Sequence, residues 1–384
     1  MIRFPTSLEQ ALPHASTHDV RAGGTDLQDR RHLGITRRPI LDLRDLPGLD
    51  QIEPHEGGVR VGALVRLQDL ADAEVIRARY PAIAEGAGNL ANPQIRAVAT
   101  IGGNLLQAPR CWYYRHPHQR CLKRGGEACL ARGGDHVWHV CFDDGGCAAP
   151  HASTMAMILM AYDAEVDVAG GPPRAVEALY QTGGDPTRDH ALEPGALLTH
   201  ARLPAPWSSE RAAYLRATGR ARAEWPLVEV VARLRLDSSG VIADARVAAG
   251  AVANAPLRLR AVEAQLVGKP ALEATFEQAA RFASEGARPL PQTGYKLELL
   301  RVSVVDALTR AAERSPTAVA PPPEPTPPEP APPKGSARKA ARAANKAADK
   351  AANKAANKRA GPPSARTPST PSNEPAAKAP GGSQ

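Results

Sequence analysis

The stretch ANPQIRAVATIGGNLLQAPRCWYYRHPHQRC, residues 91–121, combines two features that decide the fold. A paired glycine, Gly102 and Gly103, lies inside an apolar run typical of a strand. Directly after this run the chain becomes aromatic and rich in arginine, and this part begins at Cys111 and ends at Cys121. We interpret the first feature as a loop whose backbone a ligand can approach closely, and the second as the start of a segment built around cysteine.

A second paired glycine occurs earlier, in RAGGTDL, residues 21–27. Adjacent glycines let backbone N–H groups turn toward one point, and phosphate oxygens can then approach the bare backbone. Thr25 and Asn104 add polar groups beside the two loops. Together the loops fit one extended anionic cofactor held from two sides, and a plain turn or bulge at each loop is the alternative. Neither loop has the spacing of a GxGxxG fingerprint or of a P-loop.

All five cysteines of the chain lie within one short segment, at Cys111, Cys121, Cys129, Cys141 and Cys147. Five is an odd number and the N-terminus shows no secretion signal, so a reduced, metal-binding set is favoured over disulfides. The tight cysteine pairs usual in zinc sites are absent from the sequence. The separations instead suggest four thiolates that arrive from one looping insertion, as a [4Fe–4S] cluster requires. Spacing alone leaves cluster and zinc both open.

The charge of the chain is distributed unevenly. Of the formal net charge of +8, +7 lies from Ala320 onward, so the body is close to neutral. The end of the chain is first rich in proline and then in alanine and lysine, which predicts a disordered basic tail without a packed core. The tail lacks interleaved aromatic residues, so we expect no nucleic-acid partner. No run of about 18 apolar residues occurs, so we expect no membrane insertion.

The length of 384 residues predicts two to three domains. In the first part, VRAGGTDL, ILDLRDLPGLDQIE and GVRVGALVRL are typical of strands, whereas LQDLADAEVIRARYPAIAEGAGNL repeats apolar residues at helical spacing. Further along, AEVDVAG, ALLTHARLPAP, LVEVVARLRL and VIADARVAAGAV predict strands, and LRAVEAQLVG, ALEATFEQAARFASEGA and LELLRVSVVDALTRAAER predict helices. The fold class is therefore α+β.

Several separated motifs carry a family resemblance: RAGGTDL, ANPQIRAVATIGGNLLQ, EWPLVEVVARLRL and VAAGAVANAPLRLRAVEAQLVGK. In this order they resemble the FAD-binding (medium) subunit of the xanthine dehydrogenase and aldehyde oxidase family of molybdenum hydroxylases. The resemblance implies a two-lobed FAD-binding domain (PCMH/vanillyl-alcohol-oxidase-like) over residues 1–190, with a Cys-rich cluster insertion at 110–148. A smaller α/β C-terminal domain would span 191–314, and the tail 315–384.

The resemblance also implies a set of site residues. The FAD pyrophosphate would lie on the first loop, from Ala22 through Gly23, Gly24, Thr25 and Asp26 to Leu27. Thr100, Gly102, Gly103 and Asn104 would lie along the rest of the cofactor, and Leu197 near the isoalloxazine ring. Close relatives carry an acidic residue after the last cysteine, where this chain has Ser153 and Thr154, so a neutral hydroxyl takes the place of a carboxylate. No catalytic acid or base is expected, because the flavin supplies the redox chemistry.

The cysteine motifs RCWYYR, RCLKRGGEAC and GGCAAPHAS resemble the insertion of one branch, the periplasmic-type aldehyde oxidoreductases. By this resemblance Cys111, Cys121, Cys129 and Cys147 are the ligands of a [4Fe–4S] cluster. Cys141 has no counterpart there, and is either a buried spare thiol or a substitute ligand. Basic residues crowd the same segment, either near the cluster or on a solvated face.

The function implied is electron transfer within a heterotrimeric molybdenum hydroxylase. A molybdopterin-binding large subunit would oxidise the substrate, a small [2Fe–2S] subunit would pass electrons to the FAD of this chain, and an external acceptor would receive them. The alternative is a zinc-stabilised, flavin-free binding protein on the same fold. Localisation is expected to be cytoplasmic, or periplasmic by co-export with a signal-bearing partner.

Overall fold

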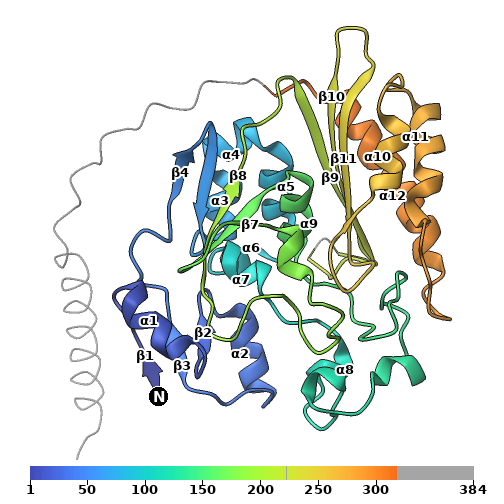
Figure 1. Cartoon of the computed structure of the whole chain (residues 1–384). Coiled ribbons are helices and arrows are strands. Elements are labelled where there is room, and N and C mark those ends of the chain that lie inside the picture. Colours follow the sequence, from blue (N-terminus) through green and yellow to red (C-terminus); the bar gives the residue numbers. More distant parts are fainter. Residues whose placement is uncertain (222, 318–384) are drawn as a thin grey trace, which may run out of the picture. The chain divides into compact units, whose positions relative to one another are not determined.

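The computed structural model describes residues 1–221 and 223–317. From position 318 onward, the predicted tail lies outside the described residues. The structure therefore does not test the prediction that the tail is disordered. The described chain contains three sheets, with helices packed against them, and α10 (Arg260–Leu266), α11 (Glu273–Ala280) and α12 (Tyr295–Glu313) lie on the outer side of the C-terminal sheet (Figure 1).

The first lobe is built on a parallel sheet of three strands in the order β1-β3-β2. Parallel neighbours need crossover connections, and α1 and α2 supply them. The elements are β1 (Ile2–Arg3), α1 (Leu8–Ala15), β2 (Asp19–Arg21), α2 (Thr25–His32) and β3 (Ile40–Asp42). The expectation of one strand through VRAGGTDL is wrong in its second half. The strand ends at Arg21, because Gly24 adopts a left-handed conformation (φ +80°) from which α2 begins.

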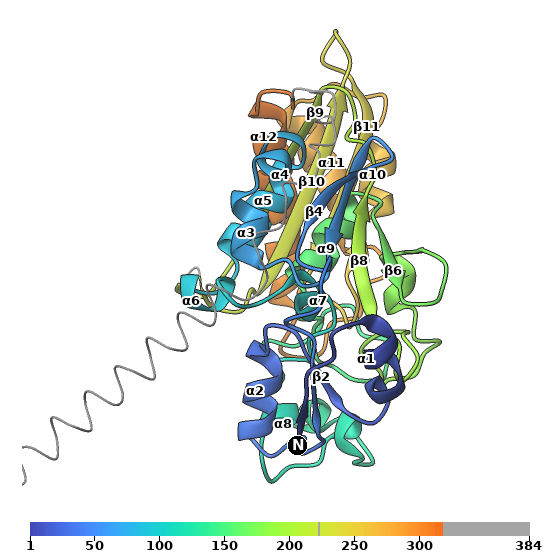
Figure 2. The ribbon, with the colours of Figure 1, turned by 90° about the vertical axis from the view of Figure 1, so that its left-hand side faces the viewer.

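The second lobe has an antiparallel sheet in the order β4-β5-β8-β6-β7 with helices on one side (Figure 2). Its strands are β4 (Ile52–His55), β5 (Gly58–Gly62), β6 (Glu165–Val168), β7 (Arg174–Ala175) and β8 (Leu198–Leu203). Its helices are α3 (Leu67–Asp72), α4 (Glu74–Arg79), α5 (Pro81–Asn89), α6 (Pro93–Arg96), α7 (Ile101–Leu105) and α9 (Thr154–Ala161), with the 3-10 turn η3 (Glu177–Tyr180). The long helical pattern after residue 66 thus becomes three helices, because Ala73 is extended and Pro81 restricts Tyr80 before it.

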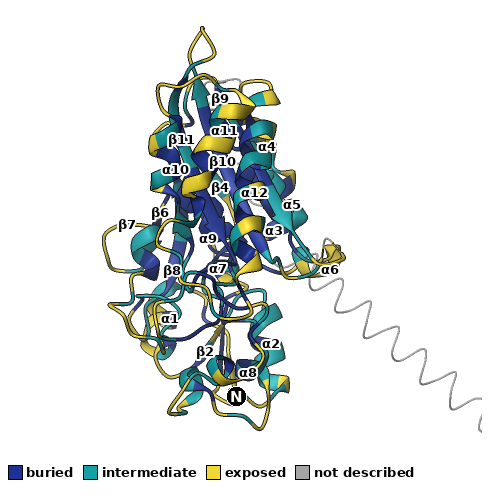
Figure 3. Cartoon of the chain, turned by 90° about the vertical axis from the view of Figure 1, so that its right-hand side faces the viewer, coloured by how far each residue is buried: buried dark blue, intermediate teal, exposed yellow. Residues whose placement is uncertain are grey.

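The C-terminal domain is an antiparallel sheet in the order β12-β11-β10-β9, covered on one face by helices. Its elements are β9 (Glu210–Ala217), β10 (Val228–Leu236), β11 (Ile242–Gly250), β12 (Leu257–Arg258), α10 (Arg260–Leu266), α11 (Glu273–Ala280), η4 (Arg281–Ser284) and α12 (Tyr295–Glu313). Helix α9 packs on β10 and β11 and also on α5, and all eight of its residues are buried (Figure 3). One face of this sheet is therefore covered by helices of its own domain, and the other face by α9 of the second lobe.

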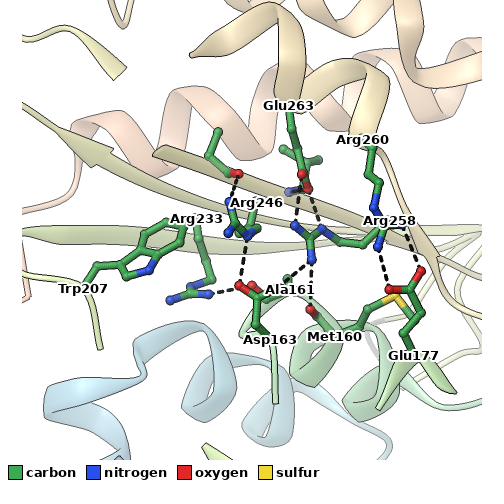
Figure 4. A network of polar contacts seen from close by, with 12 residues as sticks. Met160, Ala161, Asp163, Glu177, Trp207, Arg233, Arg246, Arg258, Arg260 and Glu263 are labelled. Carbon is green, nitrogen blue, oxygen red and sulfur yellow. Dashed lines mark hydrogen bonds and ion pairs between the residues drawn. The ribbon is translucent and has the colours of Figure 1, made fainter. Parts of the chain in front are cut away.

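A network of ion pairs fastens this sheet to the turn after α9 (Figure 4). Asp163 accepts from Arg246 at 2.9 Å and from Arg258 at 2.8 Å. Deeper in, Arg233 pairs with Glu210 at 2.7 Å and donates to the carbonyl of Ala161 at 2.6 Å. Since the Arg233 and Glu210 side chains are at most 2% exposed, this pair needs both its members to offset their desolvation.

The cysteine-bearing segment between α7 and α9 is mostly irregular. Its regular parts are short: α8 (Trp112–Arg115), η1 (Leu122–Arg124) and η2 (Leu130–Gly133). It is joined to the C-terminal domain through the backbone, because Cys141 and Phe142 both donate to the carbonyl of Val252, at 2.9 and 3.0 Å. The carbonyl of Cys141 in turn accepts from Arg288 at 3.0 Å.

Candidate functional site

A cavity of about 800 Å³ lies where the two glycine loops meet. The first loop depends on missing side chains, since a Cβ atom on Gly23 would stand 2.0 Å from the carbonyl oxygen of Val98. Gly24 then supplies the left-handed turn that starts α2, and the first turn of this helix faces the cavity. Backbone N–H groups at a helix N-terminus attract anionic groups. The first loop therefore has the form of a cradle for a phosphate.

Gly102 and Gly103 lie inside helix α7 in the same cavity wall, so the expectation of a strand-like run with a glycine loop is wrong here. The side chain of Thr100 caps α7 by accepting from the N–H of Gly103 at 3.1 Å. The Oδ1 atom of Asn104 accepts from the hydroxyl of Ser153 at 2.7 Å and from the N–H of Met155 at 3.3 Å. The carbonyl group of the Asn104 side chain is thus held by the start of α9, and its amide nitrogen takes no part in these contacts.

Most predicted cofactor residues line this one cavity. The lining set contains Ala22, Gly23, Gly24, Thr25, Asp26, Leu27, Thr100, Gly102, Gly103, Asn104 and Leu197. Ser153 and Thr154 are buried outside the lining, and Ser153 reaches it through Asn104. Segments about 170 residues apart in sequence are brought together, which a single dinucleotide requires.

Cys111, Cys121, Cys129 and Cys147 line a second, much smaller cavity of about 10 Å³. Cys141 does not line it and lies in the core of the C-terminal domain, where it is fully buried. Of the two alternatives for Cys141, the structure matches the buried thiol. Within the described part of the chain, no three His, Cys, Asp or Glu side chains are arranged as a metal site. The structure thus gathers the four thiols, and the cluster itself stays a prediction.

The thiols are chemically unequal. A hydrogen bond from Cys147 lowers the pKa of the Cys129 thiol, and the same bond raises the pKa of Cys147. The N–H of Ala148 also donates to the Cys129 sulfur, at 3.4 Å. Cys111, whose pKa burial raises to about 11, lies 3.3 Å from Nε2 of His139. Within the pair, the hydrogen bonds from Cys147 and Ala148 favour the thiolate of Cys129, the form that binds soft metals.

Comparison with known proteins decides the family. The model described as "FAD binding domain in molybdopterin dehydrogenase" matches residues 3–206, which is more than half of the chain. The model "CO dehydrogenase flavoprotein C-terminal domain" matches residues 213–312. The chain belongs to the FAD-binding subunits of the molybdenum hydroxylases. The resemblance and the fold class inferred from the sequence motifs are thereby confirmed.

Individual relatives agree with this assignment. The aldehyde oxidoreductase FAD-binding subunit PaoB of Escherichia coli is 36% identical over 299 residues, covering 76% of this chain and 90% of the relative. The glyceraldehyde dehydrogenase medium chain of Sulfolobus acidocaldarius is 23% identical over 315 residues, covering 80% and 96%. Among solved structures, reconstituted CO dehydrogenase from Oligotropha carboxidovorans has a TM-score of 0.65 at 22% identity, covering 82% and 98%. As in an oxidoreductase subunit of this family, FAD is the expected occupant of the large cavity.

The hydroxyl of Thr154 lies beside a buried carboxylate that comes from another element. Thr154 donates to Glu229 at 2.7 Å, and the hydroxyl of Tyr214 donates to the same oxygen at 2.5 Å. Arg216, which lines the FAD cavity, pairs with Glu229 as well. The hydroxyl of Thr154 is thus directed to a buried acid on β10, and the negative charge near this wall of the cavity comes from Glu229.

Sequence reasoning missed the partners of Asp26. This carboxylate lies at 3.0 Å from Arg30, at 3.2 Å from Arg110 and at 2.5 Å from Arg115. Burial would raise the pKa of Asp26, but Arg110, Arg115 and Arg30 outweigh it and lower the pKa. Because Arg115 also pairs with Asp29, helix α2 of the FAD cavity is fastened to the cysteine segment. The excess of arginine after Cys111 was the only signal in the sequence for this link.

Other basic residues of the segment are also paired. Lys123 lies 2.7 Å from Asp189, and Arg132 lies 2.5 Å from Asp143. The sequence left two interpretations of these basic residues, cations near a cluster and a solvated face. Neither interpretation included the carboxylate partners. Within residues 1–221 and 223–317, no helix is long and apolar enough to cross a bilayer.

Proposed function

We propose that this chain is the FAD- and iron–sulfur-containing electron-transfer subunit of a heterotrimeric molybdenum hydroxylase. Electrons would come from the [2Fe–2S] centres of a small partner, pass to FAD, and leave to an external acceptor. The observation that carries the proposal is the adjacency of the two cavities. Arg110 lines the FAD cavity and the next residue, Cys111, lines the cysteine cavity. Redox centres held by neighbouring residues are close enough for electrons to move between them.

The residues of the large cavity fit FAD. Its volume of about 800 Å³ suits a large cofactor, and Gly23 and Gly24 leave the backbone open at the start of α2. Bound there, the flavin would supply the redox chemistry, while the protein binds it, orients it and sets its potential. Leu197 lies in the wall with Leu64 and Leu43, which provide an apolar surface for a planar ring.

The residue types that line the small cavity fit a [4Fe–4S] cluster, and the four thiols would have to move apart to admit it, because the cavity measures only about 10 Å³. Four thiols line it, and the rest of its lining carries neither carboxylate nor imidazole: Tyr113, Tyr114, Leu122, Lys123, Leu130 and Ala149. Four soft anionic ligands in apolar surroundings suit iron–sulfur clusters, and zinc with four cysteines is the competing occupant. Bound there, the cluster would accept and release single electrons. A role for Cys141 as ligand is disfavoured by its place in another core.

The substrate would be oxidised in a partner chain. A large molybdopterin-binding subunit and a small [2Fe–2S] subunit are the expected partners, and aldehydes are the favoured substrates because one relative is named an aldehyde oxidoreductase subunit. The complex would work in the cytoplasm, or in the periplasm by co-export with a signal-bearing partner.

The absorbance spectrum and metal content of the full chain, purified without oxygen, test the proposal. We expect flavin bands, a broad brown absorbance, and about four irons per chain for one cluster. Zinc without iron or flavin would favour the flavin-free binding protein. Deleting the chain from the complex should abolish acceptor reduction while substrate still reduces the molybdenum centre. An unchanged rate of acceptor reduction would contradict the proposal.

A further inference from the structure

The link between α2 and the cysteine segment contains more positive than negative charge. Three guanidinium groups, those of Arg30, Arg110 and Arg115, surround two carboxylates, Asp26 and Asp29. The Asp26 and Arg115 side chains are 12% and 11% exposed and Arg110 is 22% exposed, so water screens these three groups only in part, whereas Asp29 is 45% exposed. A further carboxylate near Arg30, Asp19, already pairs with Arg31 at 3.3 Å. A buried surplus cation is costly unless an anion compensates it.

Arg110 is the least satisfied member of this cluster. Its terminal nitrogen reaches Asp26 at 3.2 Å and Gln107 at 2.9 Å, and its guanidinium lies 4.6 Å from the ring centre of Trp225. Its Nε–H is buried and has no hydrogen-bond partner among the described residues. Arg115 differs, because its Nε donates to the carbonyl of Pro109 at 2.9 Å. The surplus charge and the unpaired donor therefore coincide at Arg110.

Arg110 is open to the large cavity through part of its side chain, which is 22% exposed. Arg110, Gln107 and Trp225 line the large cavity together with both glycine loops, whereas Arg115 does not line it. A group bound in this cavity can thus reach Arg110 while Arg115 stays occupied by its carboxylates. Guanidinium groups form their strongest hydrogen bonds with oxygens that carry negative charge.

We propose that Arg110 binds the cofactor directly, an N–H of its partly exposed guanidinium donating to an oxygen of the bound dinucleotide that carries negative charge. This inference rests on the proposed binding of FAD in the cavity. Two oxygens have the required chemistry: one on the pyrophosphate, charged in every redox state, and one on the isoalloxazine ring, charged after reduction. Asp26 and Gln107 hold the guanidinium in place, and Trp225 covers its face.

The test compares three variants of the full chain, each stripped of flavin and titrated with FAD. Arg110→Gln removes the charge and the donor, and Arg110→Lys keeps the charge without the guanidinium. Arg211→Gln is the matched control, because Arg211 is a partly buried arginine that donates to the carbonyls of Ala312 and Arg314 and lines neither cavity. Thermal unfolding and iron content show whether each variant is folded.

Two readouts separate the two oxygens. If Arg110 contacts the pyrophosphate, Arg110→Gln should raise the Kd for oxidised FAD about 10- to 100-fold. The Kd for ADP should then rise by a similar factor, because ADP carries the same pyrophosphate, and Arg110→Lys should recover part of the loss. If Arg110 contacts the reduced ring, FAD affinity should change little. Arg110→Gln would then weaken the binding of reduced flavin about tenfold more than that of oxidised flavin. This change lowers the two-electron midpoint potential by about 30 mV.

Unchanged affinity and unchanged potential in Arg110→Gln would overturn the inference. So would a loss of iron at constant flavin affinity, because the charge would then serve the cysteine cavity. These results differ from a failure of the proposed function, in which the unsubstituted chain itself binds no flavin. Arg211→Gln should match the unsubstituted chain in every readout, and an equal loss there would also overturn the inference.

Discussion

The FAD cavity and the cysteine cavity lie next to each other, but different kinds of chemical group line them. The first, of about 800 Å³, is walled by backbone at the starts of α2 and α7, where glycines leave room. The second, of about 10 Å³, is walled by side chains from α8, η1, η2 and irregular chain. The shape of the first depends on Cβ atoms that are missing, and that of the second on four sulfur atoms. Adding a methyl group at a glycine should therefore disturb the FAD cavity, and removing a sulfur atom should disturb the cysteine cavity.

The largest effect should follow the loss of a cavity-lining sulfur. Cys147→Ala removes one of the four proposed ligands, and the iron content should fall close to zero, because a [4Fe–4S] cluster needs all four thiolates. FAD content should stay near that of the unsubstituted chain. The control is Cys141→Ala, which removes a sulfur from the C-terminal core and costs about 1 kcal/mol of stability as a small cavity forms. Equal loss of iron from both variants would contradict the assignment of ligands.

The converse change adds one methyl group at the first glycine loop. In Gly23→Ala the new Cβ would meet the carbonyl oxygen of Val98 at 2.0 Å, and a backbone oxygen cannot turn aside. The loop must shift, and we expect FAD to bind about 10- to 100-fold more weakly, as for an overpacked site. Flavin titration measures this, and iron content should not change. The control is Gly294→Ala, where no atom lies within 4 Å of the new Cβ. Full FAD affinity in Gly23→Ala would show that the loop is not part of the site.

The sequence predicted the backbone-built cavity better than its connections. The left-handed conformation of Gly24 is a local signal, since it depends on the residue itself. Gly102 instead lies in helix α7, where a Cβ atom would stand 2.8 Å from the Cβ atom of Ala63. The four cysteines were equally visible because the residue type carries the chemistry. Strands such as β10 and β11 follow from their apolar patterns, and their lengths match.

Features that depend on tertiary contacts were not predictable. Helix α9 is buried on every side, so TMAMILMA has no helical periodicity to reveal it. The partners of Asp26 lie more than 80 residues away in sequence, apart from Arg30. The pairing of Thr154 with Glu229 spans 75 residues and depends on α9 packing against β10. Sequence patterns record burial and local conformation, and they do not record which buried charges meet.

A smaller effect, shared by both cavities, should follow a break in the link between them. Arg115→Gln removes the ion pairs to Asp26 and Asp29, and the free energy of unfolding should fall by about 1–2 kcal/mol. FAD affinity and iron content should then decline together, since α2 and the cysteine segment lose a common support. In Arg132→Gln, which removes the pair with Asp143 and the hydrogen bonds to the carbonyl of Gly146, all inside the segment, FAD affinity should be kept. A loss confined to one cavity in Arg115→Gln would mean that the two sites are independent.

The smallest effect is expected at Thr154, which lies behind the wall of the FAD cavity. Thr154→Val removes one hydrogen bond to Glu229 and leaves those from Tyr214 and Arg216, so the free energy of unfolding should fall by about 1 kcal/mol. Glu229→Gln should cost about 3 kcal/mol, because it leaves the buried Arg216 charge without its carboxylate. Chemical denaturation measures both values, and flavin titration shows whether the hydroxyl matters to the cofactor. If Thr154→Val weakened FAD binding as strongly as Gly23→Ala, the Thr154 hydroxyl would have to contact the cofactor, contrary to its place behind the wall.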